Sequence, residues 1–367
     1  MLRSLLPVLL VLSVSACAFA PKTADPSWPR AAEMVTDPES GSAYGIEQVF
    51  IRSGKHDIAS TLLLPERQRP HGAVILVSGS RDALASPEGA LPRKLVTRGI
   101  AVLVLGKKGV GASSGDWKRE TFEDRAANVQ AAVDWLARRK EIDPDRIGLY
   151  GHSQGGYIAS IMAARGHGLR FAVLAAAPAQ RVREQIASDD MYIRMRDKGL
   201  SREQAQAQTD RMMWMLDAGL SLCPLVRVDY LCGIYTYDPL PVLEQIRIPV
   251  LALFGERDNM VPPEENLAAM RAALARAGVP HVIKVLPAAN HQFWKSIRGT
   301  PSEYGELVAG RSPVFPYFQP GNARHERALG LRGNRAEYAD AYFDTVLGFI
   351  DAQLATPGTQ GVRASLE

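Results

Sequence analysis

Apolar residues alternate between two patterns along most of the chain. Continuous apolar runs typical of buried strands stand at 73–78, 100–105, 146–150, 171–177, 249–255 and 281–286. Segments with helical periodicity lie between or after them, at 88–98, 121–139, 154–165, 263–277 and 338–354. Two further segments, 47–54 and 57–64, resemble paired strands. We therefore predict an α/β fold with a mostly parallel central sheet flanked by helices on both faces.

One stretch interrupts this alternation. Residues 180–245 contain no strand of the core type but two helical patterns, 182–197 and 202–218. Ser201 and Gln204 have the spacing of a capping box at the start of the second helix. We expect a helical cap at 180–245 over the carboxyl ends of the strands. It would divide the core into residues 46–179 and 246–355, with a C-terminal tail at 356–367.

The N-terminus has the layout of a secretory signal. Arg3 precedes an apolar run from Leu5 to Val14 that is too short to span a bilayer, and small residues follow. The sequence VSAC at 14–17 resembles a bacterial lipobox, which implies a signal peptide at 1–16 and lipidation of Cys17. The alternative is an ordinary signal peptide. Residues 17–45, rich in proline, are expected to be a tether, and the protein to be exported and anchored in the bacterial cell envelope, or else secreted.

Export changes how the other cysteines are interpreted. With Cys17 lipidated, Cys223 and Cys232 remain as an even pair in an oxidising compartment. A disulfide between them would close a loop of roughly ten residues and contribute about 2–3 kcal/mol. Two buried free thiols are the alternative. No histidine or second cysteine pair lies nearby in sequence, so we expect no zinc site.

Composition removes one class of partner. The 367 residues are 46% hydrophobic and 22% charged, and the formal net charge is only +4. Basic residues are dispersed, and the local runs at 138–140 and 181–183 are short. We therefore expect no binding to nucleic acid.

A serine lies between glycines where a strand pattern becomes a helix pattern. Residues 151–155, GHSQG, fit G-x-S-x-G, in which the serine takes a strained turn and the glycines avoid a clash of Cβ with backbone. RGIAVLVLGKKGVGASSGDW, EIDPDRIGLYGHSQGGYIAS, GERDNMVPP and NHQFW occur in this order. On these stretches the chain resembles the α/β-hydrolase superfamily over roughly 46–355, in the bacterial esterase branch related to dienelactone hydrolases and serine aminopeptidases.

The resemblance implies a catalytic triad in the chain order Ser153, Asp258, His291. A serine hydroxyl needs an adjacent base, and the base needs a partner that fixes its tautomer. Asp258 and His291 each follow a predicted strand, so all three residues are expected at the same edge of the sheet. A loop-capping role for Asp258, with Glu256 as the acid, and a structural role for His291 are the alternatives.

The oxyanion of the reaction needs two N–H donors. Gln154 is expected to supply one from its backbone, and the loop after the strand ending near Ser78 the other, with Ser80 as donor and Arg81 as second choice. Two features depart from the superfamily pattern. Ser78 replaces the usual histidine, and GKKGVG at 106–111 lacks an aspartate that organises the loop in relatives.

Each candidate substrate-binding residue has two possible roles. Arg81 attracts an anionic substrate or is simply solvated. Met213 and Trp214 on the second cap helix cover an apolar acyl pocket or form the core of the cap. The connection at 299–335 is long and contains Phe315, Tyr317 and Phe318, which restrict the site mouth or pack on the side of the core.

The expected activity is serine-catalysed cleavage of a carboxylic ester through an acyl-enzyme. An aminopeptidase or amidase, or a thioesterase, on the same triad is the alternative, and an inactive envelope lipoprotein is a third hypothesis. The partners would be a small ester or amide substrate and a membrane, the latter through Cys17. The sequence contains no dinucleotide motif and no metal-binding cluster, so neither cofactor nor metal is predicted.

Overall fold

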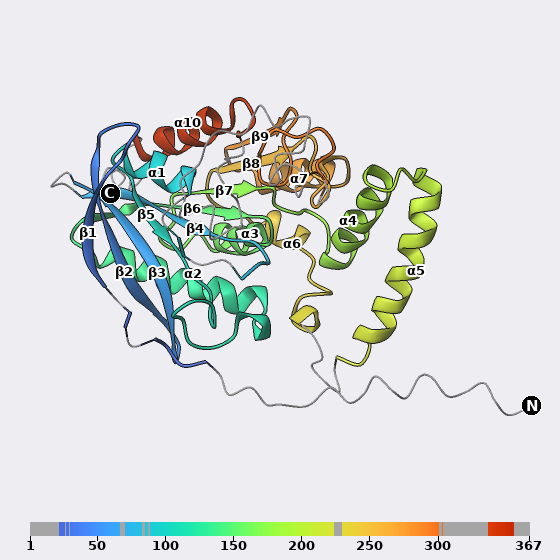
Figure 1. Ribbon diagram of the computed structural model, residues 1–367, viewed down its shortest axis with the longest axis horizontal. Helices are drawn as coiled ribbons and strands as arrows, with labels where there is room; N and C mark the ends of the chain where they lie inside the picture. The colour runs from blue at the N-terminus through green and yellow to red at the C-terminus, as the bar shows by residue number, and fades with distance from the viewer. Residues whose placement is uncertain are drawn as a thin grey trace, which may run out of the picture.

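The strands form a single twisted sheet across the molecule (Figure 1). The computed structural model describes residues 22–25, 27–28, 30–66, 70–82, 85–86, 89–223, 230–300, 303 and 337–355. Its strands are β1 (Arg30–Thr36), β2 (Ala43–Ser53), β3 (His56–Pro65), β4 (His71–Val77), β5 (Ala101–Val104), β6 (Ile142–His152), β7 (Phe171–Ala175), β8 (Val250–Gly255) and β9 (His281–Leu286).

The sheet has an antiparallel part and a parallel part. Its nine strands follow the order β1-β2-β3-β5-β4-β6-β7-β8-β9. Pairs from β1 to β5 are antiparallel, and all pairs from β5 to β9 are parallel. Strands β4, β5, β7 and β8 are almost fully buried, which explains their continuous apolar runs, whereas β9 at the edge of the sheet is mostly exposed. The α/β prediction with a mostly parallel sheet is confirmed.

Helices cover both faces of the sheet. Helices α2 (Phe122–Ala137), α3 (Gln154–Arg165), α6 (Leu240–Leu243) and α7 (Pro263–Ala277) contribute to the core on one face. Helices α1 (Ala90–Val96) and α10 (Tyr342–Ala355) close the other. A capping box of Thr121 and Asp124 is present at the start of α2. Two short 3-10 helices, η1 (Trp117–Arg119) and η2 (Tyr230–Gly233), contact each other.

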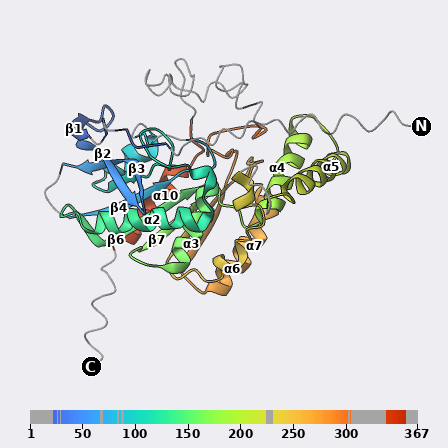
Figure 2. The same cartoon turned by 90° about the horizontal axis from the view of Figure 1, so that it is seen from below.

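The segment expected to form a cap is helical where the structure describes it. Helices α4 (Val182–Arg196) and α5 (Arg202–Leu220) lie side by side at one end of the molecule in both views (Figures 1 and 2). The capping box of Ser201 and Gln204 starts α5 as predicted. Met191, Tyr192 and Ala205 form a small separate core between these two helices. Cys223, after α5, and Cys232, in η2, form a disulfide.

The structure differs from the expected tether at 17–45. Residues 30–36 form the edge strand β1, which pairs with β2, and β2 begins at Ala43. The hydrophobic pattern did not predict this strand, because an edge strand with one face toward solvent contains few apolar residues. The signal peptide and Cys17 lie outside the described residues. Among the helices that are described, none has both the length and the apolar character needed to cross a membrane.

Candidate active site

Ser153 occupies a sharp turn between β6 and α3. Its backbone has φ 56° and ψ −124°, and its N–H donates to the Ala175 carbonyl at 2.9 Å. A Cβ on Gly151 would lie 2.3 Å from the Gly155 carbonyl oxygen, and one on Gly155 would lie 2.5 Å from that of Val77. Neither position admits a side chain. This turn therefore has the strained geometry expected of a nucleophile elbow.

His291 and Asp258 form a buried hydrogen-bonded pair. The His291 Nδ1 donates to Asp258 Oδ2 at 2.8 Å, and Asp258 is fully buried. The second carboxylate oxygen accepts the N–H groups of Met260 and Val261, each at 2.9 Å. These bonds fix the carboxylate, which fixes the imidazole and leaves its Nε2 for a proton transfer. Asp258 follows β8, and His291 lies five residues after the end of β9.

Ser153, Asp258 and His291 all follow parallel strands and so share one edge of the sheet. In the described part of the chain, no hydrogen bond joins the Ser153 hydroxyl to the His291 ring. Such bonds are often long in a structure without substrate and shorten in the complex. The structure thus joins the acid to the base directly and brings the serine to the same edge.

His152 supports the His291 loop, a contact that the sequence does not reveal. Its Nε2 lies 2.8 Å from the His291 carbonyl oxygen, and the two rings have centroids 4.9 Å apart. Burial, with a smaller effect from a charge on His291, lowers the pKa of His152 to about 4. The ring is therefore neutral at pH 7, and its Nε2–H donates to that carbonyl.

The histidine loop itself is held by polar side chains. Asn290 Oδ1 accepts the N–H groups of Gln292 and Trp294 at 2.9 and 3.0 Å. Glu303 is buried and accepts four bonds, from the Ser296 hydroxyl at 2.6 Å and from the N–H groups of residues 297, 298 and 299 at 2.7 Å each. Because its two carboxylate oxygens accept all four bonds, Glu303 holds the backbone of residues 297–299 in place.

The expected oxyanion donors flank the serine. A Cβ on Gly79 would lie 3.0 Å from the Ser153 Cβ and 3.3 Å from its Oγ, so the loop after β4 passes directly beside the nucleophile. Among the described residues, neither the Ser80 N–H nor the Gln154 N–H has a hydrogen-bond acceptor in the protein. Two unengaged donors beside a strained serine can bind the oxygen of a tetrahedral intermediate.

A carboxylate of the cap lies close to the His291–Asp258 pair. Asp189, on α4, is 3.5 Å from the Asn259 side-chain amide. Burial raises the pKa of Asp189 to about 7, an effect that the nearby His291 ring opposes and the carboxylates of Asp258 and Asp190 increase. No salt bridge to Asp189 exists within the described residues. A desolvated carboxylate at this edge can attract a cationic group of a substrate.

The other sequence candidates have different surroundings. Arg81 is exposed, and Met213 is buried. Trp214 is 72% exposed, so the expectation that it covers an apolar pocket is not met: its side chain is in contact mainly with solvent. Phe315, Tyr317 and Phe318 lie outside the described residues.

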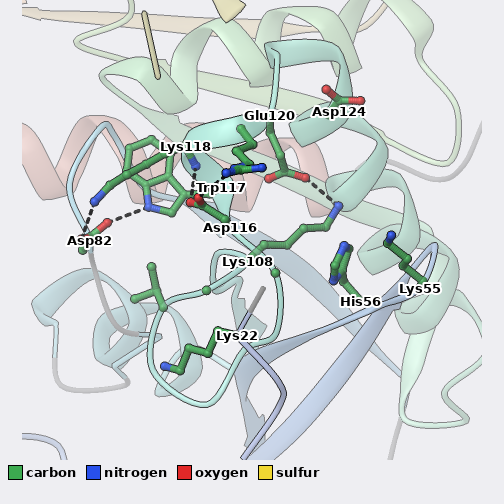
Figure 3. Close-up of a pocket in the computed structure, with 14 residues that line it drawn as sticks. Lys22, Lys55, His56, Asp82, Lys108, Asp116, Trp117, Lys118, Glu120 and Asp124 are labelled. Carbon is green, nitrogen blue, oxygen red and sulfur yellow. Dashed lines mark hydrogen bonds and ion pairs between the residues drawn. The ribbon is translucent and has the colours of Figure 1, made fainter. Parts of the chain in front are cut away.

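One cavity of the molecule adjoins the loop that carries Asp82 (Figure 3). Its volume is about 710 Å³, and its lining includes Lys22, His56, Lys108, Trp117 and Glu120. Opposite charges are paired along its wall, Lys108 with Glu120 at 2.6 Å and Lys118 with Asp82 at 3.2 Å (Figure 3).

Two family models match consecutive parts of the chain. The X-Pro dipeptidyl-peptidase (S15 family) model matches residues 54–220, and the dienelactone hydrolase family model matches residues 233–311. The first match contains the elbow with Ser153, and the second contains Asp258 and His291. Both models describe hydrolases.

Individual relatives are similar over part of their length. Dipeptidyl-peptidase 5 of Porphyromonas gingivalis is 25% identical over 205 residues, 54% of this chain and 27% of that protein. The acylamino-acid-releasing enzyme of Rattus norvegicus is 24% identical over 233 residues, 60% of this chain and 28% of that protein. The chain thus spans about a quarter of the length of these curated relatives.

The fold has counterparts among solved structures. An acetyl xylan esterase from Paenibacillus sp. R4 superposes with a TM-score of 0.50 over 70% of this chain and 81% of that one, at 15% identity. This likeness concerns the fold alone. With a mostly parallel sheet covered on both faces, a strained serine turn after β6 and two hydrolase family matches, the chain belongs to the α/β-hydrolase superfamily.

Proposed function

We propose that this protein is a serine esterase that cleaves a small carboxylic ester. The observation that carries the proposal is the strained Ser153 at the same sheet edge as the buried His291–Asp258 pair. The family matches support a hydrolase in general. Ester cleavage is our extension, because the site holds the groups that acyl transfer to water requires.

The proposed reaction has two steps. The Ser153 Oγ attacks the ester carbonyl carbon while its proton passes to the His291 Nε2, and the carbonyl electrons move onto the oxygen held by the N–H groups of Ser80 and Gln154. When this intermediate collapses, the C–O bond to the alcohol breaks and the alcohol takes the proton from His291. Water then attacks the acyl-enzyme with the same proton transfers, which releases the carboxylic acid and free Ser153.

The decisive experiment removes the nucleophile. Ser153→Ala should fold normally and lose several orders of magnitude in kcat on p-nitrophenyl acyl esters, because only binding and the oxyanion donors would remain. A fluorophosphonate should label the wild-type protein on Ser153. The control is Ser221→Ala, an exposed serine whose hydroxyl bonds to the Ala218 carbonyl. Labelling that persists in Ser153→Ala would overturn the assignment.

An exopeptidase acting through the same triad is the second candidate. The observation favouring it is Asp189, a carboxylate near His291 that could hold the ammonium of a peptide N-terminus. Aminoacyl-p-nitroanilides tested against p-nitrophenyl acyl esters separate the two functions. An exopeptidase should prefer the anilides and lose that preference in Asp189→Asn, whereas an esterase should cleave uncharged acyl esters with little change in this variant.

We also propose that the mature protein is exported and attached to a membrane through lipidated Cys17, on the basis of VSAC after the apolar run. No metal or cofactor is part of the proposed reaction.

A further inference from the structure

The loop expected to supply the second oxyanion donor is bound from behind by a buried lysine. Lys107, just after β5, is 5% exposed. Its ammonium donates to the carbonyl oxygen of Gly79 and, at 2.6 Å, to that of Arg81. These two carbonyls flank Ser80, so one side chain holds both ends of the short segment that carries the expected donor and passes beside the nucleophile.

The first of these bonds acts on the donor peptide itself. The Gly79 carbonyl and the Ser80 N–H belong to the same planar peptide group, in which the two point in opposite directions when it is trans. A cation bound to the oxygen therefore directs the N–H away from Lys107. It also withdraws electron density from the nitrogen, which makes the N–H a stronger donor to an oxyanion.

The lysine is influenced by the carboxylate of Asp82, whose charge offsets the effect of burial on its pKa only in part. Among the described residues it forms no salt bridge, and its other close contact is the Trp117 ring, whose centroid lies 4.5 Å from Nζ. Trp117 donates in turn to Asp82 at 2.6 Å, the residue that follows Arg81. Desolvation of an ammonium is costly, and carbonyl oxygens compensate for it only partly. A purely structural position would favour an apolar side chain.

A second buried cation supports the same region. Arg125, on α2, donates to the side-chain oxygen of Gln154 and to the Ser78 carbonyl at 3.3 Å. Its guanidinium carbon lies 5.4 Å from the Trp117 ring centroid. Lys107 and Arg125 thus place two positive charges behind the two expected donors. Burial, followed by the charge on Arg125, lowers the pKa of Lys107 to about 7.

We propose that Lys107 is a positioning residue for the oxyanion site, which orients and polarises the Gly79–Ser80 peptide so that the Ser80 N–H binds the developing oxyanion. This inference rests on the proposed serine hydrolase function. It assigns a role to GKKGVG, the stretch where the expected aspartate is missing: a lysine bound to the carbonyl groups organises the loop in its place.

The test uses the neighbouring lysines as a matched pair in the full-length protein. Lys107→Met keeps the length of the side chain and removes the charge and its donors. Lys108→Met makes the same change one residue along, where Nζ pairs with Glu120 at 2.6 Å and not with the loop (Figure 3). Lys107→Gln retains a neutral donor and serves where Lys107→Met does not fold.

The primary measurement is the second-order rate constant for labelling of Ser153 by a fluorophosphonate, because the phosphoryl oxygen occupies the oxyanion site and no natural substrate is needed. Lys107→Met should label about 10–100-fold more slowly than the wild type. This reduction is at most as large as the one that follows the loss of a direct oxyanion donor. Lys107→Gln should be intermediate, and Lys108→Met within about twofold of wild type. On a p-nitrophenyl ester the loss should appear in kcat with KM nearly unchanged.

A pH profile gives a readout that a structural role would not move. The ratio of the wild-type labelling rate to the Lys107→Met labelling rate should fall as pH rises above about 7, where Lys107 loses its proton. A folded Lys107→Met or Lys107→Gln variant that labels at the wild-type rate would overturn the proposal. If the wild type labels on Ser153 but cleaves no ester, the proposed esterase function fails while the labelling rates still decide the role of Lys107. If Ser153 does not label at all, both fail.

Discussion

At the scale of single residues, most of the strained backbone conformations lie near the proposed catalytic residues. Ser153, Ala176, Ala288 and Phe293 are four of the five non-glycine residues described with positive φ. Ser153 is the proposed nucleophile, Ala176 follows the strand that binds its N–H, and the other two flank His291. Conformations of this kind cost about 1–3 kcal/mol each and persist only where the surroundings impose them. The surroundings here are the buried strands and the loop bonds described above.

Asp189 provides a residue-scale prediction about pH and stability. Its pKa is raised to about 7 in the folded protein, against an ordinary value of 3.8. Between about pH 4 and 7 the folded state therefore binds more protons at this group than the unfolded state, and its contribution to stability falls as pH rises through that window. Asp189→Asn should raise Tm at pH 8 by about 2–5 °C and change it little near pH 4, measured by thermal unfolding.

The adjacent aspartate is the control for this prediction. Burial also disfavours ionisation of Asp190, but bonds from Arg194 at 2.6 Å and Thr209 at 2.7 Å outweigh it and lower its pKa. Asp190→Asn should therefore lower Tm at pH 8, the opposite sign. A fall in Tm at pH 8 for both variants would contradict the charge state inferred for Asp189.

At the scale of elements, the sequence predicted most of the parallel sheet because buried strands are apolar throughout. The ends of those strands then located Ser153, Asp258 and His291, since parallel strands share one carboxyl edge. Lys107 and Asp189 could not be found in this way. A lysine in a loop and an aspartate on a helix are ordinarily solvated, and only the tertiary structure shows that these two are desolvated beside the site.

The turn after the histidine loop gives an element-scale prediction. Glu303 accepts four hydrogen bonds, one from the Ser296 hydroxyl and three from the N–H groups of residues 297–299. Glu303→Gln keeps the shape but turns one oxygen into an amide that cannot accept, so at least one donor loses its partner. We expect the free energy of unfolding, measured by denaturant titration, to fall by about 1–3 kcal/mol. We also expect kcat to fall, because the Ser296 N–H donates to the carbonyl of Ala288 and so connects this turn to the loop that holds His291.

Glu337→Gln is the matched control for Glu303→Gln. Glu337 pairs with Lys295 at 2.7 Å but has 35% of its side chain exposed, so its loss should cost less than about 1 kcal/mol. Equal effects of the two substitutions would show that Glu303 is no more than a surface charge.

At the scale of the whole molecule, the first described residues are attached to the loop after β5. The Lys22 carbonyl accepts the Gly115 N–H at 2.8 Å, its ammonium donates to the Gly111 carbonyl, and the Asp25 N–H donates to the Ala112 carbonyl at 3.0 Å. Only five residue steps separate Cys17 from Lys22, which span at most about 18 Å. A lipid on Cys17 would therefore hold this loop near the bilayer.

The position of that loop determines the orientation of the anchored protein. It follows β5, whose carboxyl end lies at the same sheet edge as that of β6, where Ser153 stands. A lipid on Cys17 would thus turn the edge with the proposed catalytic residues toward the membrane. The edge where β6 begins, near Lys140, would face away. A tether over all of residues 17–45 would impose no such orientation.

Energy transfer to a labelled bilayer tests the anchor and the orientation together. Arg119→Cys and Lys140→Cys place one dye each on exposed residues at opposite edges of the sheet, and the acceptor is a headgroup-labelled lipid in phosphatidylethanolamine–phosphatidylglycerol vesicles. Lipidation blocks Cys17 and the disulfide blocks Cys223 and Cys232, so only the new thiol reacts.

Transfer from residue 119 should exceed transfer from residue 140, and Cys17→Ala should abolish both by releasing the protein. Equal transfer would contradict a fixed orientation, and binding that survives Cys17→Ala would contradict the lipid anchor. Because the two outcomes are separate, a protein that is anchored but freely rotating can be told from one that is not anchored at all.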